Sequence, residues 1–152
     1  MNYDELLQEA DDMGLIVKEK SLQLNDGRIK GNRVAIRRDM PTVKKACTLA
    51  EEMGHSCTTY GDILEQNSVM DIRQEQRARL WAYNKLIGLQ GIIKAHLHRC
   101  TSLYDMADYL NVTEEFLMDA LKCYRSKYGC YTVVDNYIIC FESTVAVIEM
   151  YS

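Results

Sequence analysis

Apolar residues recur with helical spacing along most of the chain. Residues 2–13 alternate acidic and apolar positions in this way and stop before Gly14, which is typical of a short amphipathic helix followed by a glycine. The only proline, Pro41, lies where the next helical pattern begins. From there the spacing predicts helices at about 42–56, 69–88, 89–99, 102–110 and 113–127.

Two other regions alternate apolar and polar residues or are rich in β-branched residues. The stretches LIVKEKSLQL (15–24) and RIKGNRVAIRR (28–38) are joined through Asn25-Asp26-Gly27, a turn sequence, and together predict a β-hairpin. YTVVDNYIICF (131–141) and TVAVIEM (144–150) predict a second small β unit around Asp135-Asn136. Because there is no linker-like stretch and no internal repeat, the pattern predicts a single, mainly helical α+β domain over residues 1–152.

The composition is that of a globular protein, with 47% hydrophobic and 26% charged residues in 152. Apolar runs are only a few residues long and the N-terminal segment is acidic, so neither a membrane span nor a signal peptide is expected, and the predicted location is cytoplasmic. The six cysteines include no C-x-x-C pair. Most of them are therefore expected to be small buried residues, not a disulfide framework or a zinc knuckle.

The net charge of −4 argues against broad nucleic-acid binding, and no direct contact with nucleic acid is expected. Residues 28–45 are nevertheless strongly basic, and Asp39 is their only acidic residue. This segment is either a solvated face or a surface that receives an acidic partner. Its basic residues are Arg28, Lys30, Arg33, Arg37, Arg38, Lys44 and Lys45.

A possible metal-binding motif lies in KKACTLAEEMGHSCTTYGDI (44–63). Zinc peptidases carry H-E-x-x-H on a helix, where the two histidines bind the metal and the glutamate acts as general base. In this chain Glu51 stands at the first histidine position, and Glu52 and His55 stand at the other two. Residues four apart point the same way on a helix, so Glu51 and His55 share a face with Glu52 beside them. A solvated polar face of an amphipathic helix explains the same pattern.

The next predicted helix offers a further carboxylate. In MDIRQEQRARLWAYNKLIG (70–88), Glu75 falls within about 60° of Ile72, Ala78 and Ala82, which places it along or beside the inward stripe. A carboxylate in that position pairs with a cation, takes a proton or binds a metal. Arg79, one turn further on, is the alternative partner of Glu75.

The order of these segments, from the first helix through KKACTLAEEMGH, GDI, RQEQRARLWAYNKLIG and SLYDMADYLNVTEEFLMDAL to the terminal β unit, resembles the ImmA/IrrE metallopeptidases. The likeness is to their short members from phages and mobile elements. It implies a zincin-like fold, a zinc ion and cleavage of a helix-turn-helix repressor. It also implies Glu52 as general base, and Glu51, His55 and Glu75 as metal ligands. Glutamate at position 51 adds a negative charge, which favours harder ions such as Mn²⁺.

Three functions remain open from the sequence: first a metallo-endopeptidase that relieves repression, second an inactive anti-repressor that only binds its partner, and third a DNA-binding regulator. Asp62 is either a carboxylate that orients a metal ligand or a turn residue. Cys57 is expected to be structural, and His96 and His98 to lie at the surface. Residues 102–124 imitate a DNA-binding helix-turn-helix, but the second helix begins with acidic residues that repel phosphate, so it is expected to serve packing. Nothing in the sequence predicts the oligomeric state.

Overall fold

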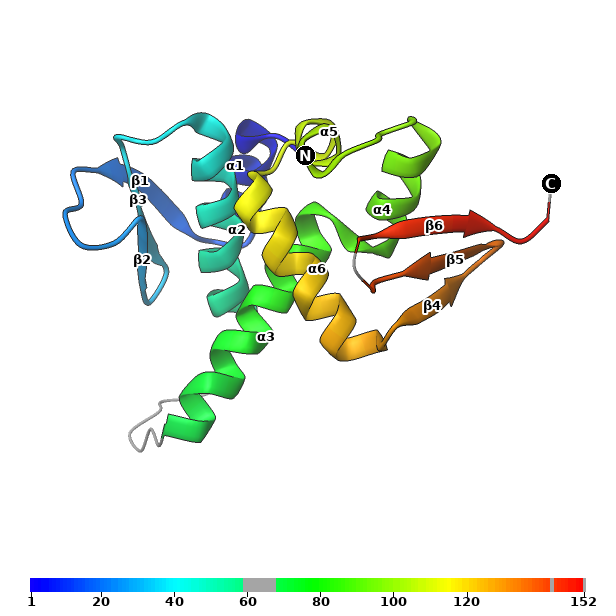
Figure 1. Cartoon of the computed structure of the whole chain (residues 1–152). Coiled ribbons are helices and arrows are strands. Elements are labelled where there is room, and N and C mark those ends of the chain that lie inside the picture. Colours follow the sequence, from blue (N-terminus) through cyan, green and yellow to red (C-terminus); the bar gives the residue numbers. More distant parts are fainter. Residues whose placement is uncertain (59–67, 143, 152) are drawn as a thin grey trace. The chain divides into compact units, whose positions relative to one another are not determined.

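The computed structural model describes residues 1–58, 68–142 and 144–151, with residues 68–70 described as backbone only. The chain divides into two compact units, Met1–Lys85 and Leu86–Ser152. Each unit has its own small β-sheet with helices packed against it (Figure 1). The α+β class and the mainly helical content are therefore confirmed, while the assignment of the whole chain to one domain stays a prediction.

Helix α1 (Tyr3–Asp12) opens the first unit as the hydrophobic pattern predicts. Its start is fixed by a capping box, in which the backbone N–H of Glu5 donates to Asn2 Oδ1 at 2.8 Å and that of Asn2 donates to Glu5 Oε2 at 3.1 Å. After the helix, Gly14 adopts a left-handed conformation with φ of +82°. The chain then turns into the sheet.

The first sheet has the order β1-β3-β2, with β1 (Ile16–Lys20) parallel to β3 (Arg33–Arg37) and β2 (Gly27–Lys30) antiparallel to it. The predicted hairpin through residues 25–27 is therefore wrong. The hairpin joins β2 to β3 instead, and its turn contains Gly31 at φ of +60°. The physical reason is that β3 buries two large apolar residues and takes the centre, whereas the charged strands β1 and β2 suit the edges.

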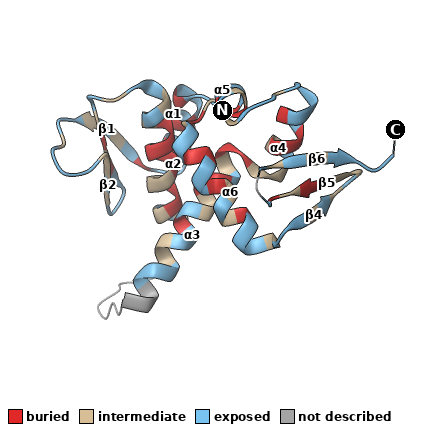
Figure 2. Ribbon diagram, viewed as in Figure 1, coloured by how far each residue is buried: buried red, intermediate tan, exposed pale blue. Residues whose placement is uncertain are grey.

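Helix α2 (Thr42–Thr58) packs together with α1 on one face of this sheet. Its buried side includes Leu49, Ala50 and Met53, which are fully shielded from solvent (Figure 2). On the sheet, Val34 and Ile36 of β3 face the same core. The opposite side of α2 is left to polar residues, as its periodicity predicts.

Helix α3 (Ser68–Leu86) is longer than its buried part. Ala78 and Ala82 are fully buried, but Ile72 is 57% exposed. The prediction that Ile72 lies on an inward stripe is therefore wrong, because the first turns of α3 extend beyond the core of the first unit and have little to pack against (Figure 2).

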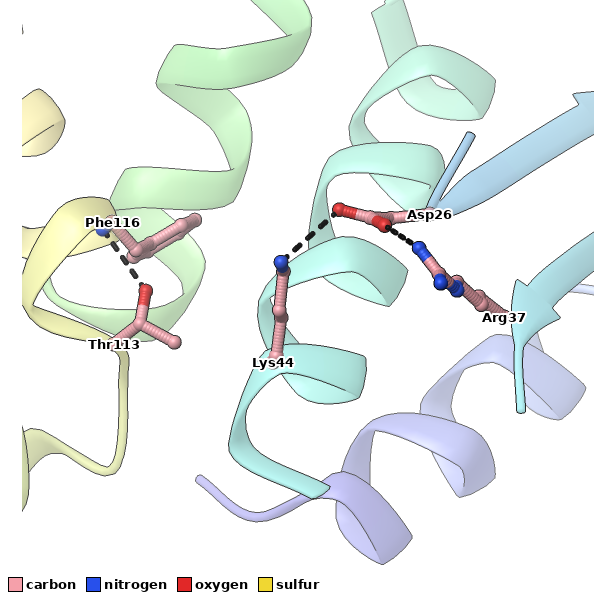
Figure 3. A network of polar contacts seen from close by, with 5 residues as sticks. All are labelled: Asp26, Arg37, Lys44, Thr113 and Phe116. Carbon is pink, nitrogen blue, oxygen red and sulfur yellow. Dashed lines mark hydrogen bonds and ion pairs between the residues drawn. The ribbon is translucent and has the colours of Figure 1, made fainter. Parts of the chain in front are cut away.

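The second unit is built from three helices and an antiparallel sheet of order β4-β5-β6, and its core includes Leu117, Tyr124 and Ile139. The Thr113 hydroxyl caps the last helix by accepting from the N–H of Phe116 at 3.0 Å (Figure 3). The sequence predicts all of these elements. They are α4 (Gly88–Leu97), α5 (Leu103–Leu110), α6 (Glu114–Tyr128), β4 (Tyr131–Val134), β5 (Tyr137–Cys140) and β6 (Ala146–Glu149).

Within the described residues, no helix combines the length and the apolar character needed to cross a membrane. All six cysteines are free thiols. Cys47 is buried, four cysteines are half-buried and Cys130 is exposed, so the expectation that most of them are buried is wrong.

Candidate metal and peptidase site

Three predicted site residues, Glu51, Glu52 and His55, lie near the C-terminal end of α2. All three are half-buried, and Met53 and Gly54 between them are buried. The helix therefore holds the polar groups at the margin of the core, where they are neither fully solvated nor enclosed. This is the face that the spacing of the motif predicts.

Gly54 allows α3 to approach this margin closely. A Cβ atom at position 54 would lie 2.3 Å from the backbone oxygen of Ala78, far inside van der Waals contact. Glycine in the middle of a helix costs about 1 kcal/mol relative to alanine, so its use here reflects the close crossing of the two backbones. The crossing brings the end of α2 against the middle of α3.

At this crossing His55 meets Glu75. The His55 Nε2 atom lies 3.2 Å from Glu75 Oε2, and the two side chains are 29% and 43% exposed. The other carboxylate oxygen of Glu75 accepts a hydrogen bond from Arg79 Nε at 2.9 Å. One oxygen of Glu75 thus contacts the imidazole of His55, and the other contacts Arg79, its predicted alternative partner.

Negative charge gathers around Glu52. Burial first, and then the charges of Glu51 and Glu75, raise the pKa of Glu52 to about 7. Arg79 brings positive charge to the cluster, and although burial lowers its pKa, the hydrogen bond and charge of Glu75, with smaller contributions that include the charge of Glu51, raise it overall. Three carboxylates therefore influence one another here, and one of them, Glu75, contacts both Arg79 and His55.

Glu52 also lies beside the edge of the sheet. A Cβ atom at Gly27, the first residue of β2, would be 3.2 Å from both Cγ and Oε1 of Glu52 and 2.5 Å from Cγ2 of Thr48. Glycine at position 27 thus leaves room for the Glu52 carboxylate. Among the described residues β2 pairs only with β3, so its other edge has no strand partner.

The donors of this cluster suit a divalent ion. Two ligands at 2.0–2.2 Å from a tetrahedral zinc ion lie about 3.3–3.6 Å apart, and the separation of 3.2 Å between His55 Nε2 and Glu75 Oε2 is close to that range. Within residues 1–58, 68–142 and 144–151, however, no group of three or more His, Cys, Asp or Glu side chains is arranged to hold an ion. The structure brings together two of the predicted ligands, and Glu51 as the third stays a prediction.

The remaining candidates lie elsewhere. Asp62 is outside the described residues. Cys57 is half-buried, and burial raises the pKa of its thiol, which keeps it neutral and fits a structural role. His96 and His98 are exposed, as predicted, and the His98 ring stacks on Tyr109 with centroids 4.4 Å apart.

Sequence reasoning missed the two glycines that shape the site. The sequence pattern assigns Gly27 to a turn and gives Gly54 no role in the motif. The available signal was a glycine in the interior of a predicted helix, which is unfavourable unless another backbone approaches it. No comparable local signal identifies Gly27, because its neighbours Thr48 and Glu52 are distant in sequence.

Comparison with known protein families gives one match. The family described as IrrE N-terminal-like domain, a peptidase family, matches residues 10–122 of the chain. These residues contain Glu51, Glu52, His55 and Glu75 and extend across the division between the two units. No curated protein and no solved structure matches the chain.

Proposed function

Because the chain belongs to the family of IrrE N-terminal-like domains, we propose that it is a metal-dependent endopeptidase that relieves repression by cutting a helix-turn-helix repressor of a phage or mobile element. The observation that carries this proposal is the contact between His55 Nε2 and Glu75 Oε2 beside the half-buried Glu52. An imidazole and a carboxylate, two kinds of zinc ligand, lie next to a second carboxylate that can serve as a base, and this supports the proposal.

The metal ligands in this proposal are His55, Glu75 and Glu51. A bound zinc ion supplies a Lewis acid and lowers the pKa of a water molecule. Burial and the negative charges of Glu51 and Glu75 raise the pKa of Glu52, and a divalent cation bound beside these carboxylates would offset that charge. Glu51 in place of a histidine adds a negative charge to the ligand set, which favours Mn²⁺ as an alternative to zinc.

Glu52 is the proposed general base. Its pKa of about 7 lies close to neutral pH, where a carboxylate can both accept a proton from water and return it to the leaving amine nitrogen. Its side chain lies beside Gly27, the first residue of β2, so this proton acceptor is next to the edge of the sheet.

The unpaired edge of β2 is the proposed binding place for the substrate chain. An extended peptide can add to an exposed sheet edge through backbone hydrogen bonds. A peptide bound in this way would run past Gly27 and therefore close to the Glu52 carboxylate. This geometry supports a polypeptide substrate, while the choice of a repressor rests on the family resemblance alone.

One observation favours a second candidate, an inactive anti-repressor that binds its partner without cutting it. Glu75 already has a cation on one oxygen and an imidazole on the other, so the cluster is held together without an ion. In this case the fold and the β2 edge would serve recognition only.

The Glu52→Gln variant tests the proposal. It keeps the size of the side chain and removes the proton acceptor, so cleavage of candidate repressors is expected to fall by roughly 10²-fold or more. Binding of the repressor is expected to persist. Fragments are measured by mass spectrometry and binding by surface plasmon resonance.

The matched control is Glu149→Gln, the same change at an exposed residue of β6 in the second unit. Equal cleavage by Glu52→Gln and the unmodified chain would reject the role of Glu52. If the unmodified chain releases repressors from their operators and never cuts them, the peptidase function is rejected and the anti-repressor function is supported.

A further inference from the structure

The outer face of the first sheet carries a cluster of basic residues, here called the basic face. Pleating places alternate residues of each strand on this side, away from α1 and α2. Exposed Ile16 and the small Ala35 are its apolar members. Its basic residues are Lys18 and Lys20 from β1, Arg28 and Lys30 from β2, and Arg33 from β3.

The strand register sets these charges around a hollow. Ala35 lies between Lys18 on one side and Arg28 on the other, and Arg33 lies between Ile16 and Lys30. Because Ala35 is small and its neighbours are long, they enclose a depression of about 310 Å³ with no acidic residue in its lining. Like charges held this close repel one another, so the face is strongly attractive to an anion.

Other basic residues of the segment 28–45 have polar partners nearby. Asp26 forms ion pairs with both Arg37 and Lys44, each at 3.5 Å (Figure 3). Lys45 pairs with Glu19, and Arg38 donates to the backbone oxygen of Glu19 at 3.2 Å. By contrast, within the described part of the chain no Asp or Glu forms an ion pair with any of the five residues of the basic face.

We propose that the basic face binds the sugar–phosphate backbone of double-stranded DNA. Protein interfaces are depleted in lysine and centre on buried aromatic or arginine anchors, and this face has no aromatic residue and three lysines. Phosphate contacts, in contrast, are made by lysine and arginine without apolar anchors. The composition of the face therefore fits a phosphate backbone better than an acidic protein.

The side chains also distinguish among nucleic acids. Single strands are bound by stacking bases on aromatic rings, which the face lacks. Duplex RNA is recognised through its 2′-hydroxyls as well as its phosphates, and the face offers no serine, threonine, asparagine or glutamine for them. The net charge of −4 limits the binding to this one face and predicts weak affinity without sequence preference.

The test is fluorescence anisotropy of the full chain with labelled 20-base-pair DNA duplexes of two unrelated sequences. We expect the two sequences to bind alike, with a slope of log K against log salt of about −3 to −4, as three to five phosphate contacts give. The face variant combines Lys18→Gln, Lys20→Gln, Arg28→Gln and Arg33→Gln. Its affinity is expected to fall by about ten-fold or more at roughly 50 mM salt, and its slope to approach zero.

The control variant combines Arg73→Gln, Arg77→Gln, Lys94→Gln and Lys122→Gln, which are exposed positions outside the face. It removes the same four charges and is expected to keep both the affinity within about two-fold and the slope. The double variant Lys18→Gln with Lys30→Gln keeps the test possible if the quadruple variant does not fold. Its slope is expected to be less steep by about 2. Circular dichroism melting checks the fold of each variant.

Several outcomes would overturn the proposal. These are no binding of DNA at low salt, equal loss in the control variant, or equally tight binding of single-stranded DNA or duplex RNA. Displacement of DNA by poly-glutamate at equal charge concentration would instead identify an acidic polypeptide as the partner. Because the measurement needs neither metal nor cleavage, it is independent of the peptidase proposal.

Discussion

Helix α2 carries one charge cluster near its start and another near its end, and the two differ in balance. Near the start, Asp26 lies between Arg37 and Lys44, so one carboxylate meets two cations (Figure 3). Near the end, Glu75 contacts His55 and Arg79, and the negative charges of Glu51 and Glu75 act on the half-buried Glu52. The cations of the first cluster stabilise its carboxylate, whereas burial and like charge in the second cluster oppose the ionisation of Glu52.

The difference separates a structural contact from a functional one. The side chains around Asp26 are about 39–46% exposed, and ion pairs of this kind contribute only about 0–1 kcal/mol to stability. The second cluster works against folding, because burial and like charges make it costly to ionise Glu52. Unfavourable arrangements of this kind concentrate at binding and catalytic sites. This contrast is the physical basis for placing the site at the end of α2.

The largest effect is expected from Gly54→Ala. This change pushes α3 away from α2 and so separates Glu75 and Arg79 from the residues of the cluster that lie on α2. The new Cβ meets backbone atoms of Ala78, which cannot move aside as a side-chain end can. We expect a loss of about 1–3 kcal/mol in the free energy of unfolding, measured by urea denaturation, and loss of ion binding because His55 moves away from Glu75.

Gly91→Ala in α4 is the matched control, since its Cβ would meet only side-chain atoms of Leu110 and Ile87, at 3.3 and 3.7 Å. It is expected to be neutral or stabilising by up to about 1 kcal/mol. A Gly54→Ala protein that is as stable as the unmodified chain and binds ions equally well would show that the close crossing is unnecessary.

Glu51→His is expected to have the next largest effect, because it removes one carboxylate from the crowded cluster and restores the usual histidine of the motif. Zinc affinity is expected to rise by about ten-fold or more, and cleavage to rise or appear. Competition with a zinc-sensitive dye gives the affinity.

The same variant distinguishes a decayed histidine position from a ligand chosen for another ion. In the second case it shifts preference from Mn²⁺ to Zn²⁺ and leaves cleavage in Mn²⁺ no better. A variant that gains neither zinc affinity nor activity would contradict both and indicate a solvated polar face.

The smallest effect is expected from matched arginine changes in the two clusters. Arg79→Gln removes the cation that holds Glu75 Oε1. Ion affinity is expected to rise by about two-fold, since exposed i,i+4 pairs are worth only about 0.3–0.5 kcal/mol. Arg37→Gln removes a cation from Asp26 and is expected to leave ion affinity unchanged. Equal responses of the two variants in a calorimetric titration would remove the distinction between the clusters.

Local patterns in the sequence were sufficient to predict the helices and the face of α2 that carries Glu51 and His55. Helical periodicity depends on neighbours within one or two turns, so α2 and α3 could be located without tertiary information. The i,i+4 spacing predicts the hydrogen bond between Arg79 and Glu75. The grouping of Glu75 with His55 comes from the resemblance to the ImmA/IrrE metallopeptidases, and in the structure the two side chains are in contact.

Features that depend on distant residues were missed. The parallel pairing of β1 with β3 joins segments separated by β2, and the turn sequence at residues 25–27 gave no sign of it. The exposure of Ile72 reflects how far α3 extends past the core, which periodicity does not measure. The basic face was hidden for the same reason, because Lys18 and Lys20 come from a different strand than Arg28 and Lys30.

The most direct test of the metal site is a calorimetric titration of chelator-treated protein with Mn²⁺, an ion that the free thiols bind weakly. The unmodified chain and Asp26→Asn are expected to bind one ion per chain with equal affinity, and Glu75→Gln to bind about ten-fold or more weakly. Binding that never saturates at one ion per chain, or that is the same in Glu75→Gln, would contradict the assignment of the cluster at the end of α2 as a metal site.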